Sequence, residues 1–322
     1  MFIRARVTDM ITTAFVLGAG LGTRFRPVTD SVPKPLVPVF HKPLITFALD
    51  HLISVGIKSF VINTHRLAEY FSELFGAGEY AGVPVRLTHE AELLETGGGI
   101  KNAELLLAGG PFVSYSGDIL ADVDLQLLID EHSRRGNDVT LAVRRTGLAA
   151  AIAVRDGRVI DIANRYGTPG QFDFANIAVW NPPIFARLPP RKKISFIPVI
   201  TDWIANGGKI GAAELAGGQW FNVGSAADYL QAHRNILDQG WRPAFLRDAN
   251  WPQQIHSTAR VAPGARILGC SAVGPNCRVG EGVTLEDTIL WAGAQIASRS
   301  HLSRCIVRSH QTISGTHNDA VL

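Results

Sequence analysis

Glycines and basic side chains lie close together near the start of the chain, in the stretch LGAGLGTRFRPVTDSVPKPL. Gly18, Gly20 and Gly22 are spaced so that backbone N–H groups can approach an anion closely, because glycine has no side chain in the way. Arg24 and Lys34 supply the positive charge that backbone amides lack. These residue types and spacings indicate a phosphate-binding loop.

The loop fits neither of two common phosphate-binding patterns. The dinucleotide pattern G-x-G-x-x-G requires glycine where Thr23 stands, and the P-loop pattern requires G-K-[ST] after four residues, which is absent. Pro33 and Pro35 flank Lys34, and proline restricts both its own backbone and that of the preceding residue. We therefore expect Lys34 to be extended and fixed in direction, whereas a lone loop lysine would by default be a solvated cation.

Alternating strand and helix patterns predict the scaffold that carries this loop. From residue 12 to about 145, apolar runs such as TAFVLG and FVINT alternate with helical patterns such as KPLITFALDHLISVG. This alternation predicts βαβ units and a parallel sheet. Shorter strand patterns from 138 to 215 predict a β-rich region, which is followed by a predicted helix at about 226–238. The stretch at 238–254 shows neither the helix period nor the strand period and is therefore predicted to be a linker.

A six-residue repeat follows the linker. The aliphatic members of the repeat are Ile255, Val261, Ile267, Val273, Val279 and Leu285. Small residues occur four places after each of the first four, at Ala259, Ala265, Ser271 and Cys277. The pattern is typical of a parallel β-helix, in which each flat face buries one aliphatic residue and the corners require small ones. The repeat fades after Trp291, and HLSRCIVRSHQTISG is expected to supply a capping coil.

Composition narrows the class of protein. A chain of 322 residues with 46% hydrophobic residues can bury a large core and suggests roughly two domains. The net charge of +3 does not indicate nucleic acid or a membrane surface as a partner. Three cysteines without C-x-x-C spacing argue against a disulfide framework or a zinc site and fit a cytoplasmic location.

The opening stretch MFIRARVTDMITTAFVLGAGLG has the outline of a signal peptide, with basic residues before an apolar run. Asp9 interrupts that outline, and the apolar run merges into the glycine loop, which a secretory segment does not need. No run reaches the ~18 apolar residues that a membrane span requires. We therefore expect neither a signal peptide nor a membrane anchor.

Together these motifs resemble a known family. GAGLGTRFRPVT followed by PKPLVPV resembles the signature of the sugar-1-phosphate nucleotidyltransferases, G-x-G-x-R-x-x-P-x-T followed by P-K-P. Downstream, ETGGGIKNA, SGD, FANIAVWNP and WFNVGSAADY resemble further blocks of that family. The resemblance implies a Rossmann-like α/β catalytic domain with a mixed or parallel sheet at 1–240 and a linker at 241–254. A short left-handed parallel β-helix of hexapeptide repeats is implied at 255–322.

The resemblance also implies a reaction and roles for particular residues. A sugar 1-phosphate attacks the α-phosphorus of a nucleoside triphosphate, and pyrophosphate leaves. Arg24 would stabilise the leaving pyrophosphate, Lys34 the α-phosphate, and Asp118 would be a catalytic residue that binds Mg²⁺. The implied nucleotide-binding residues are Leu17, Gly18, Ala19, Gly20, Gly22, Thr23, Thr96 and Gly97. The implied sugar-binding residues are Gly117 and Asn176.

Two departures from the family pattern matter. Asn222 stands where many relatives carry an aspartate that binds the metal, so it would be a weaker Mg²⁺ ligand. ANRYGTP replaces an EKP segment, which leaves Arg165 as the nearest substitute for its lysine. Alternatives from the residues themselves stay open, because Asp118 in SGD also suits a turn and Asn176 also suits a strand edge.

The leading hypothesis is a Mg²⁺-dependent sugar-1-phosphate nucleotidyltransferase similar to the mannose-1-phosphate guanylyltransferases, which the tail resembles. LLETGGGI instead resembles the N-acetylmuramate 1-phosphate uridylyltransferases, so a uridylyltransferase for an amino-sugar 1-phosphate is an alternative. A non-catalytic regulatory subunit is another alternative, which the presence of the predicted catalytic side chains disfavours. About three coils are few for an acyltransferase, so the tail is expected to form a homo-oligomer.

Overall fold

The computed structural model describes residues 10–322, so the first part of the signal-like segment, up to Asp9, lies outside the described residues. Packing divides the chain into two compact units. Of the described residues, the first unit holds 10–20, Ala48–Gly117 and Ala121–Trp220. The second holds Leu21–Phe47, Asp118–Leu120 and Phe221–Leu322. This grouping differs from the predicted division of the chain, because most of the basic loop packs with the C-terminal residues.

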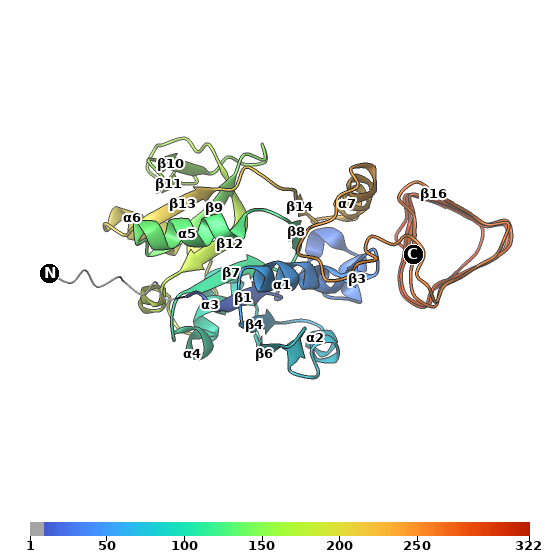
Figure 1. Ribbon diagram of the computed structural model, residues 1–322, viewed down its shortest axis with the longest axis horizontal. Helices are drawn as coiled ribbons and strands as arrows, with labels where there is room; N and C mark the ends of the chain where they lie inside the picture. Colours follow the sequence, from blue (N-terminus) through green and yellow to red (C-terminus); the bar gives the residue numbers. More distant parts are fainter. Residues whose placement is uncertain (1–9) are drawn as a thin grey trace. The chain divides into compact units, whose positions relative to one another are not determined.

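A ten-stranded mixed sheet forms the first unit (Figure 1). In sheet order its strands are β10 (Ile152–Arg155), β11 (Arg158–Ile162), β13 (Ile210–Glu214), β9 (Val139–Arg144), β12 (Asp173–Trp180), β7 (Phe112–Ser116), β1 (Thr13–Leu17), β4 (Ser59–Thr64), β6 (Val83–His89) and β5 (Glu79–Tyr80). Strands β7, β1, β4 and β6 are parallel, as the βαβ pattern predicts, whereas β12 is antiparallel to both of its neighbours. The α/β mixed sheet predicted from the sequence is confirmed.

The helices begin and end at residues that the sequence chemistry explains. They are α1 (Leu44–Ser54), α2 (Ala68–Leu74), α3 (Glu95–Asn102), α4 (Glu104–Leu107), α5 (Leu125–Arg135), α6 (Phe196–Ala205) and α7 (Ala226–Asp238), with 3-10 turns η1 (Thr23–Phe25), η2 (Val28–Asp30), η3 (Lys34–Leu36) and η4 (Pro182–Ala186). Asp124 caps α5 by accepting from the Leu127 N–H at 2.9 Å, and Ser225 caps α7. Every residue of α1 from Leu44 to Leu52 is buried, so this helix is covered on all sides and not along one apolar stripe alone.

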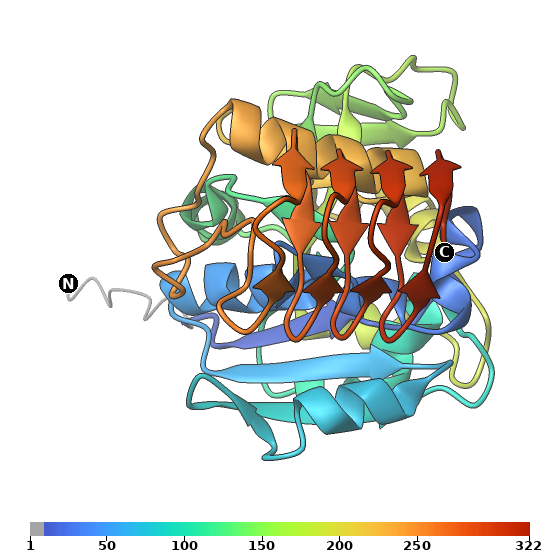
Figure 2. The ribbon, with the colours of Figure 1, turned by 90° about the vertical axis from the view of Figure 1, so that its right-hand side faces the viewer.

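The second unit contains a parallel β-helix of three sheets, whose coils stack side by side in Figure 2. The first sheet holds β15 (Arg260–Val261), β18 (Arg278–Val279), β21 (Gln295–Ile296) and β24 (Thr312–Ile313). The second holds β16 (Arg266–Leu268), β19 (Thr284–Glu286), β22 (His301–Ser303) and β25 (Thr316–Asn318). The third holds β17 (Ala272–Val273), β20 (Ile289–Leu290) and β23 (Ile306–Val307).

The β-helix extends further than the repeat alone indicates. Arg260 pairs with Arg278, so the first coil has the length of three six-residue repeats, as predicted. Arg278 pairs with Gln295, so the next coil is one residue shorter than three repeats. One corner of each later coil is therefore shorter, so the next inward residue after Leu285 is Leu290, which is 1% exposed. The strict six-residue period fails there while the coils continue to β25.

The predicted linker is a packed segment. Trp241, Leu246 and Trp251 are buried in one cluster with residues of the basic loop, α7 and the β-helix. Trp251 donates from Nε1 to the Val39 carbonyl at 2.9 Å. Two smaller sheets complete the structure, β2 (Pro38–Val39) with β3 (Lys42–Pro43), and β8 (Ile119–Ala121) with β14 (Trp220–Asn222).

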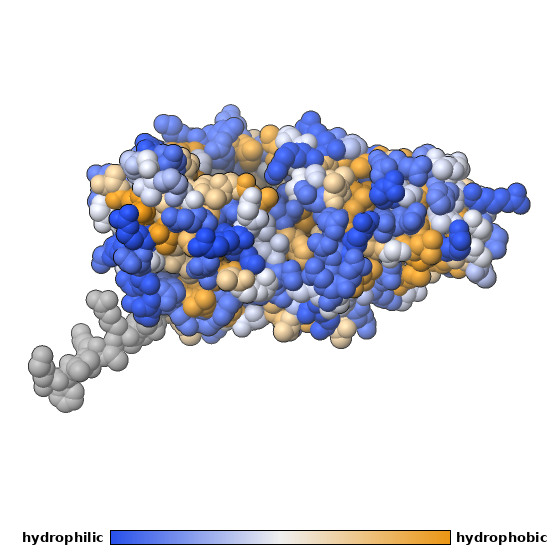
Figure 3. Space-filling view, turned by 90° about the horizontal axis from the view of Figure 1, so that it is seen from above, coloured by the Kyte–Doolittle hydropathy of each residue, from blue (hydrophilic) through white to orange (hydrophobic). Residues whose placement is uncertain are grey.

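Polar residues cover most of the face drawn in Figure 3, with apolar residues in separate patches. Among residues 10–322, no helix is long and apolar enough to cross a membrane. All three cysteines, Cys270, Cys277 and Cys305, are free thiols buried in the β-helix. Cys277 therefore fits the small-residue corner predicted from the repeat.

Acid is expected to destabilise the second unit through His233, which is fully buried on α7. Burial lowers the pKa of His233 from 6.5 to about 4. Between these values the unfolded chain binds more protons than the folded one, so this contribution to the unfolding free energy is lost as the pH falls from 6.5 to 4. The loss amounts to up to about 3 kcal/mol, since one pKa unit corresponds to about 1.4 kcal/mol.

Thermal unfolding at several pH values tests this expectation. The melting temperature should fall below pH 6.5 more steeply in the wild type than in His233→Gln. Burial also lowers the pKa of His41 and His51 to about 4, so both proteins should lose stability in acid. Charge repulsion from His41 contributes to the lowered pKa of His233, so the difference between the two slopes reports His233 together with this repulsion. Equal slopes for the two proteins would contradict the assignment to His233.

Candidate active site

The beginning of the glycine loop lies where the strand order of the sheet reverses. Strand β1 has β4 on one side and β7 on the other, and ligands of open α/β sheets bind outside the carboxyl ends of the strands at such a point. Leu17 ends β1 and pairs with Ser116 at the end of β7. The N–H of Gly117 donates to the Leu17 carbonyl at 3.0 Å. The first unit thus brings Leu17, Gly18, Ala19 and Gly117 together at one sheet edge.

Asn63 and Glu90 hold the glycine loop in place. Asn63 Oδ1 accepts from the N–H groups of Gly18 at 2.9 Å and Ala19 at 3.3 Å. Its Nδ2 donates to Glu90 Oε1 at 2.7 Å, and Glu90 Oε2 accepts from the Leu94 N–H at 2.9 Å. Glu90 is 1% exposed, so this buried carboxylate keeps the Asn63 amide in a single orientation.

Asn63 and Glu90 belong to none of the sequence motifs that predicted the site. Asn63 lies at the carboxyl end of β4, and Glu90 directly follows β6, so both occupy strand ends at the edge that carries the glycine loop. A polar residue at the end of each predicted parallel strand was the available signal.

The ETGGG segment forms the start of α3, and its glycines are needed for packing. The N–H of Gly97 donates to the Ile194 carbonyl at 2.9 Å, and a Cβ at Gly97 would lie 2.9 Å from that oxygen. Thr96 Oγ1 accepts from the Phe196 N–H at 3.4 Å. The backbone donor of Gly97 is therefore in use within the chain, and nucleotide binding by Thr96 and Gly97 stays a prediction.

Asn176 sits at an irregularity of β12. The register between β12 and β9 shifts between Phe174 and Ala178, and Asn176 has a left-handed φ of 61°. Asparagine tolerates this conformation better than most residues, and a bulge redirects the side chains around it. The backbone thus marks Asn176 as a special position, while sugar binding by its half-buried side chain stays a prediction.

The second unit holds the remainder of the glycine loop. Gly22 has a φ of 58°, and its carbonyl accepts from Thr29 Oγ1 at 2.8 Å. Thr23 and Arg24 follow in η1 and are exposed. A Cβ at Gly224 would lie 3.6 Å from both Nη atoms of Arg24, an ordinary contact distance, so the guanidinium lies beside the segment that leads into α7.

Lys34 and Asp118 are brought together by the second unit. Lys34 Nζ lies 2.7 Å from Asp118 Oδ2, and the side chains are 12% and 33% exposed, respectively. The expectation of an extended Lys34 is wrong, because Lys34 begins the turn η3, which closes when the Leu36 N–H donates to the Pro33 carbonyl at 2.8 Å. Pro33 itself is extended, with φ −58° and ψ 136°. The ion pair, and not the backbone, fixes the direction of Lys34.

The family model described as "Nucleotidyl transferase" matches residues 13–239, well over half of the chain. The chain belongs to the nucleotidyl transferase family. The resemblance stated from the glycine loop is thereby confirmed. A second family model, the "GMPPB C-terminal domain", matches residues 250–318 of this nucleotidyl transferase.

Curated relatives agree with the assignment, and a solved structure shares the fold. The chain is 28% identical to the mannose-1-phosphate guanylyltransferase of Mycobacterium tuberculosis over 298 residues, covering 90% of this chain and 83% of that protein. It is 23% identical to a UTP–glucose-1-phosphate uridylyltransferase of Synechocystis, covering 90% and 85%. The inositol-1-phosphate CTP transferase of T. maritima shares the fold, with a TM-score of 0.59, 19% identity, and 68% and 91% coverage. The resemblance of ETGGG to N-acetylmuramate 1-phosphate uridylyltransferases stays a prediction.

Two side chains of this nucleotidyl transferase, Asp118 and Asn222, offer oxygen ligands of the kind that a hard cation binds. Asp118 directly precedes β8, Asn222 ends β14, and these two strands pair with each other. Carboxylate and amide oxygens are ligands that Mg²⁺ accepts, and it typically takes only one or two from protein beside substrate phosphates. Among the described residues there is no cluster of three or more His, Cys, Asp or Glu side chains that could hold a metal. The donor set therefore fits a magnesium ion that is shared with a substrate.

Arg165 is paired within the first unit. Its Nη2 lies 3.0 Å from Asp202 Oδ1, and both side chains are about half exposed. To replace the lysine of the EKP segment, Arg165 would have to leave this exposed pair, which contributes little stability. Its role toward the sugar phosphate stays a prediction.

Proposed function

We propose that this nucleotidyl transferase transfers a guanylyl group from GTP to mannose 1-phosphate or a closely related hexose 1-phosphate. The observation that carries the proposal is the similarity over 90% of the chain to a mannose-1-phosphate guanylyltransferase. The match of the tail to the GMPPB C-terminal domain supports it independently. The alternative is UTP and glucose 1-phosphate, which the Synechocystis relative favours.

In the proposed reaction, an oxygen of the sugar phosphate forms a bond to the α-phosphorus of the triphosphate. The bond from that phosphorus to the bridging oxygen breaks, and pyrophosphate leaves with the electron pair. Catalysis of such a step requires in-line positioning and neutralisation of charge more than covalent participation. Lys34 neutralises charge on the α-phosphate, and the planar guanidinium of Arg24 binds two oxygens of the leaving group.

We propose Mg²⁺ as the cofactor, held by Asp118 and Asn222. When bound, it polarises the phosphate oxygens and offsets their charge. Asp118 accepts a hydrogen bond from Lys34 in the structure, so the same carboxylate that would hold the Mg²⁺ also orients Lys34. The backbone amides of Gly18 and Ala19 are already held by Asn63, which positions the loop before substrate arrives.

Pyrophosphate release tests the proposed function. The full-length protein is incubated with each of four nucleoside triphosphates and with mannose, glucose and N-acetylglucosamine 1-phosphates at millimolar Mg²⁺. We expect the highest kcat/KM for GTP with mannose 1-phosphate. A preference for UTP would support the uridylyltransferase alternative, and no release with any pair would overturn the reaction class.

Replacing Gly20 with alanine is expected to raise the KM for the triphosphate about 10-fold without loss of stability. A Cβ at Gly20 would meet no described atom within 4 Å, so the fold does not need glycine there. An approaching phosphate does need the space, because it binds against the backbone. Steady-state kinetics and thermal unfolding measure the two effects.

Gly22→Ala is the matched control for Gly20→Ala. Gly22 has a φ of 58°, and a Cβ there would lie 2.8 Å from Thr29 Cγ2, so this variant should lose stability by ~1–2 kcal/mol. An unchanged KM in Gly20→Ala would show that the phosphate does not approach the loop at this residue.

We also propose that the protein forms a homo-oligomer through the β-helix. Within residues 10–322, β24 and β25 each pair with a strand on one side only, and such edges favour pairing with another chain. Sedimentation of the full-length protein gives the expected mass of a dimer or larger. A monomer at micromolar concentration would contradict the proposal.

A further inference from the structure

The β2–β3 hairpin, which follows the turn that carries Lys34, has a strained backbone that contacts from other residues must stabilise. Phe40 and His41 join β2 to β3 and have left-handed φ values of 43° and 72°. A two-residue turn of this kind favours asparagine and glycine, and a bulky residue such as phenylalanine is strained there. Such strain persists only where the surroundings hold it, and it commonly occurs at functional sites.

Three side chains bind successive backbone groups of this hairpin. The Tyr229 hydroxyl donates to the Pro38 carbonyl, and Trp251 Nε1 donates to the Val39 carbonyl at 2.9 Å. The Phe40 N–H donates to His233 Nε2 at 3.3 Å. Tyr229 and His233 come from α7, so one helix fixes both ends of this short backbone run.

Tyr229 also connects the β-helix to both proposed catalytic segments. Trp291, which follows β20, donates from Nε1 to the Tyr229 oxygen at 3.1 Å. The Tyr229 ring packs on Phe25, with 5.5 Å between ring centroids, and Phe25 is the neighbour of Arg24. Burial raises the pKa of Tyr229, so its hydroxyl keeps the proton that it donates to Pro38. The Tyr229 hydroxyl thus donates one hydrogen bond and accepts another, and its side chain is fully buried. We call this chain of contacts, from Trp291 through Tyr229 to Pro38, the relay.

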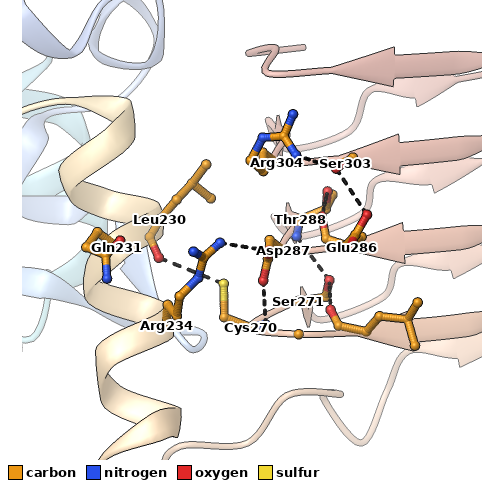
Figure 4. A network of polar contacts seen from close by, with 12 residues as sticks. Leu230, Gln231, Arg234, Cys270, Ser271, Glu286, Asp287, Thr288, Ser303 and Arg304 are labelled. Carbon is orange, nitrogen blue, oxygen red and sulfur yellow. Dashed lines mark hydrogen bonds and ion pairs between the residues drawn. The ribbon is translucent and has the colours of Figure 1, made fainter.

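A second, separate connection joins α7 to the β-helix, as Figure 4 shows. Arg234 Nη2 lies 2.7 Å from Asp287 Oδ2, and Asp287 Oδ1 accepts from the Cys270 N–H at 3.0 Å. The Arg234 and Asp287 side chains are 41% and 20% exposed. This ion pair does not include Tyr229, so it offers a way to weaken the attachment of α7 without changing the relay.

We propose that Tyr229 and Trp291 are positioning residues for catalysis, through which the β-helix holds the segment that carries Lys34. The inference rests on the proposed function, because it assigns Lys34 to the reaction. It gives the β-helix a role within each single chain, in addition to assembly. A displacement of Lys34 by a fraction of an ångström lowers the rate of a positioned reaction, whereas binding of the triphosphate to the glycine loop is affected less.

Tyr229→Phe tests the proposal, because it removes the hydroxyl and keeps the ring. We expect kcat to fall about 10-fold to 100-fold and the KM for the triphosphate to change less than 3-fold. Trp291→Phe removes the hydrogen-bond donor to the hydroxyl. It should also lower kcat more than it changes the KM for the triphosphate, but to a smaller extent. In a Lys34→Ala background, Tyr229→Phe should lower kcat no further, because a residue that acts through Lys34 has no effect once Lys34 is absent.

Arg234→Ala is the matched control, since it breaks the separate ion pair and should leave kcat within about 2-fold of the wild type. Hydrogen exchange of residues 33–41 in the full-length protein gives a readout without turnover, and it should increase in Tyr229→Phe but not in Arg234→Ala. Unchanged exchange and unchanged kcat in Tyr229→Phe would overturn the proposal. Equal losses in Tyr229→Phe and Arg234→Ala would also overturn it, because they would indicate general loosening of α7. If the wild type showed no turnover but hydrogen exchange still increased in Tyr229→Phe, the proposed function would be wrong and the structural role of Tyr229 would stand.

Discussion

Replacing Lys34 with alanine is expected to lower kcat about 10²–10³-fold, with a much smaller change in the KM for the triphosphate. The expected loss follows from removing a positive group aimed at charge that develops on the α-phosphate, an effect of ~3–4 kcal/mol in a site shielded from water. The Lys34 side chain is only 12% exposed and is fixed by its contact with Asp118. Initial rates of pyrophosphate release, with the best pair of substrates, measure the effect.

The loss should come from chemistry and not from unfolding. Asp118 is 33% exposed, so water can hydrate the carboxylate that Lys34→Ala leaves without its partner, and the variant should melt within a few degrees of the wild type. Lys58 is an exposed lysine far along the chain from the loop, and Lys58→Ala serves as the control that keeps full activity. If Lys34→Ala retained kcat within 5-fold, Lys34 would be a solvated loop cation, as its residue type alone suggests.

Lys34→Arg distinguishes charge from position. Arginine keeps the positive charge, but its planar guanidinium is larger and cannot occupy the place of a compact ammonium. We expect it to recover a small part of the lost kcat. Full recovery would indicate that Lys34 acts through long-range charge, which would weaken the assignment of a direct contact with the α-phosphate.

Local sequence was enough to predict many of the helices and strands and to name the candidate catalytic residues. The apolar runs around Phe15 and Leu49 specify a strand and a helix without knowledge of their partners, and both are fully buried as expected. Arg24, Lys34 and Asp118 could be named because two short motifs carry them. The β-helix was predicted from its repeat and its bounds from the family resemblance, whereas the repeat alone does not reach the later coils, because their shortened corners shift the period.

The supporting residues could not be predicted because tertiary contacts select them. Asn63 reaches Glu90 through the pairing of β4 with β6, and neither residue belongs to a motif. Tyr229 donates to Pro38, which lies far away in the sequence, and this contact follows from the packing of α7. For the same reason the stretch around Trp251 was predicted to be a linker, because its aromatic residues show no period although the core buries them.

Replacing Asp118 with alanine is expected to lower kcat at least about 10²-fold and to raise the Mg²⁺ concentration that gives half-maximal rate. Asp118 is the carboxylate of the proposed metal site, and one or two carboxylates are the usual protein contribution to a magnesium ion shared with phosphates. Rates measured over micromolar to tens of millimolar Mg²⁺ test both effects. Asp118→Asn keeps an oxygen ligand without its charge, so it should fall between the alanine variant and the wild type.

Asp130→Ala is the control for loss of a carboxylate, since Asp130 lies on α5 and pairs with Gln126. An unchanged magnesium dependence in Asp118→Ala would refute the metal role and leave Asp118 as a turn residue. The double variant Lys34→Ala/Asp118→Ala then decides how the pair acts. Because Lys34 Nζ and Asp118 Oδ2 are 2.7 Å apart, the effects of two directly coupled residues should not add. The double variant should therefore be little slower than the slower single variant, whereas multiplicative losses would mean that the two residues act independently in the reaction.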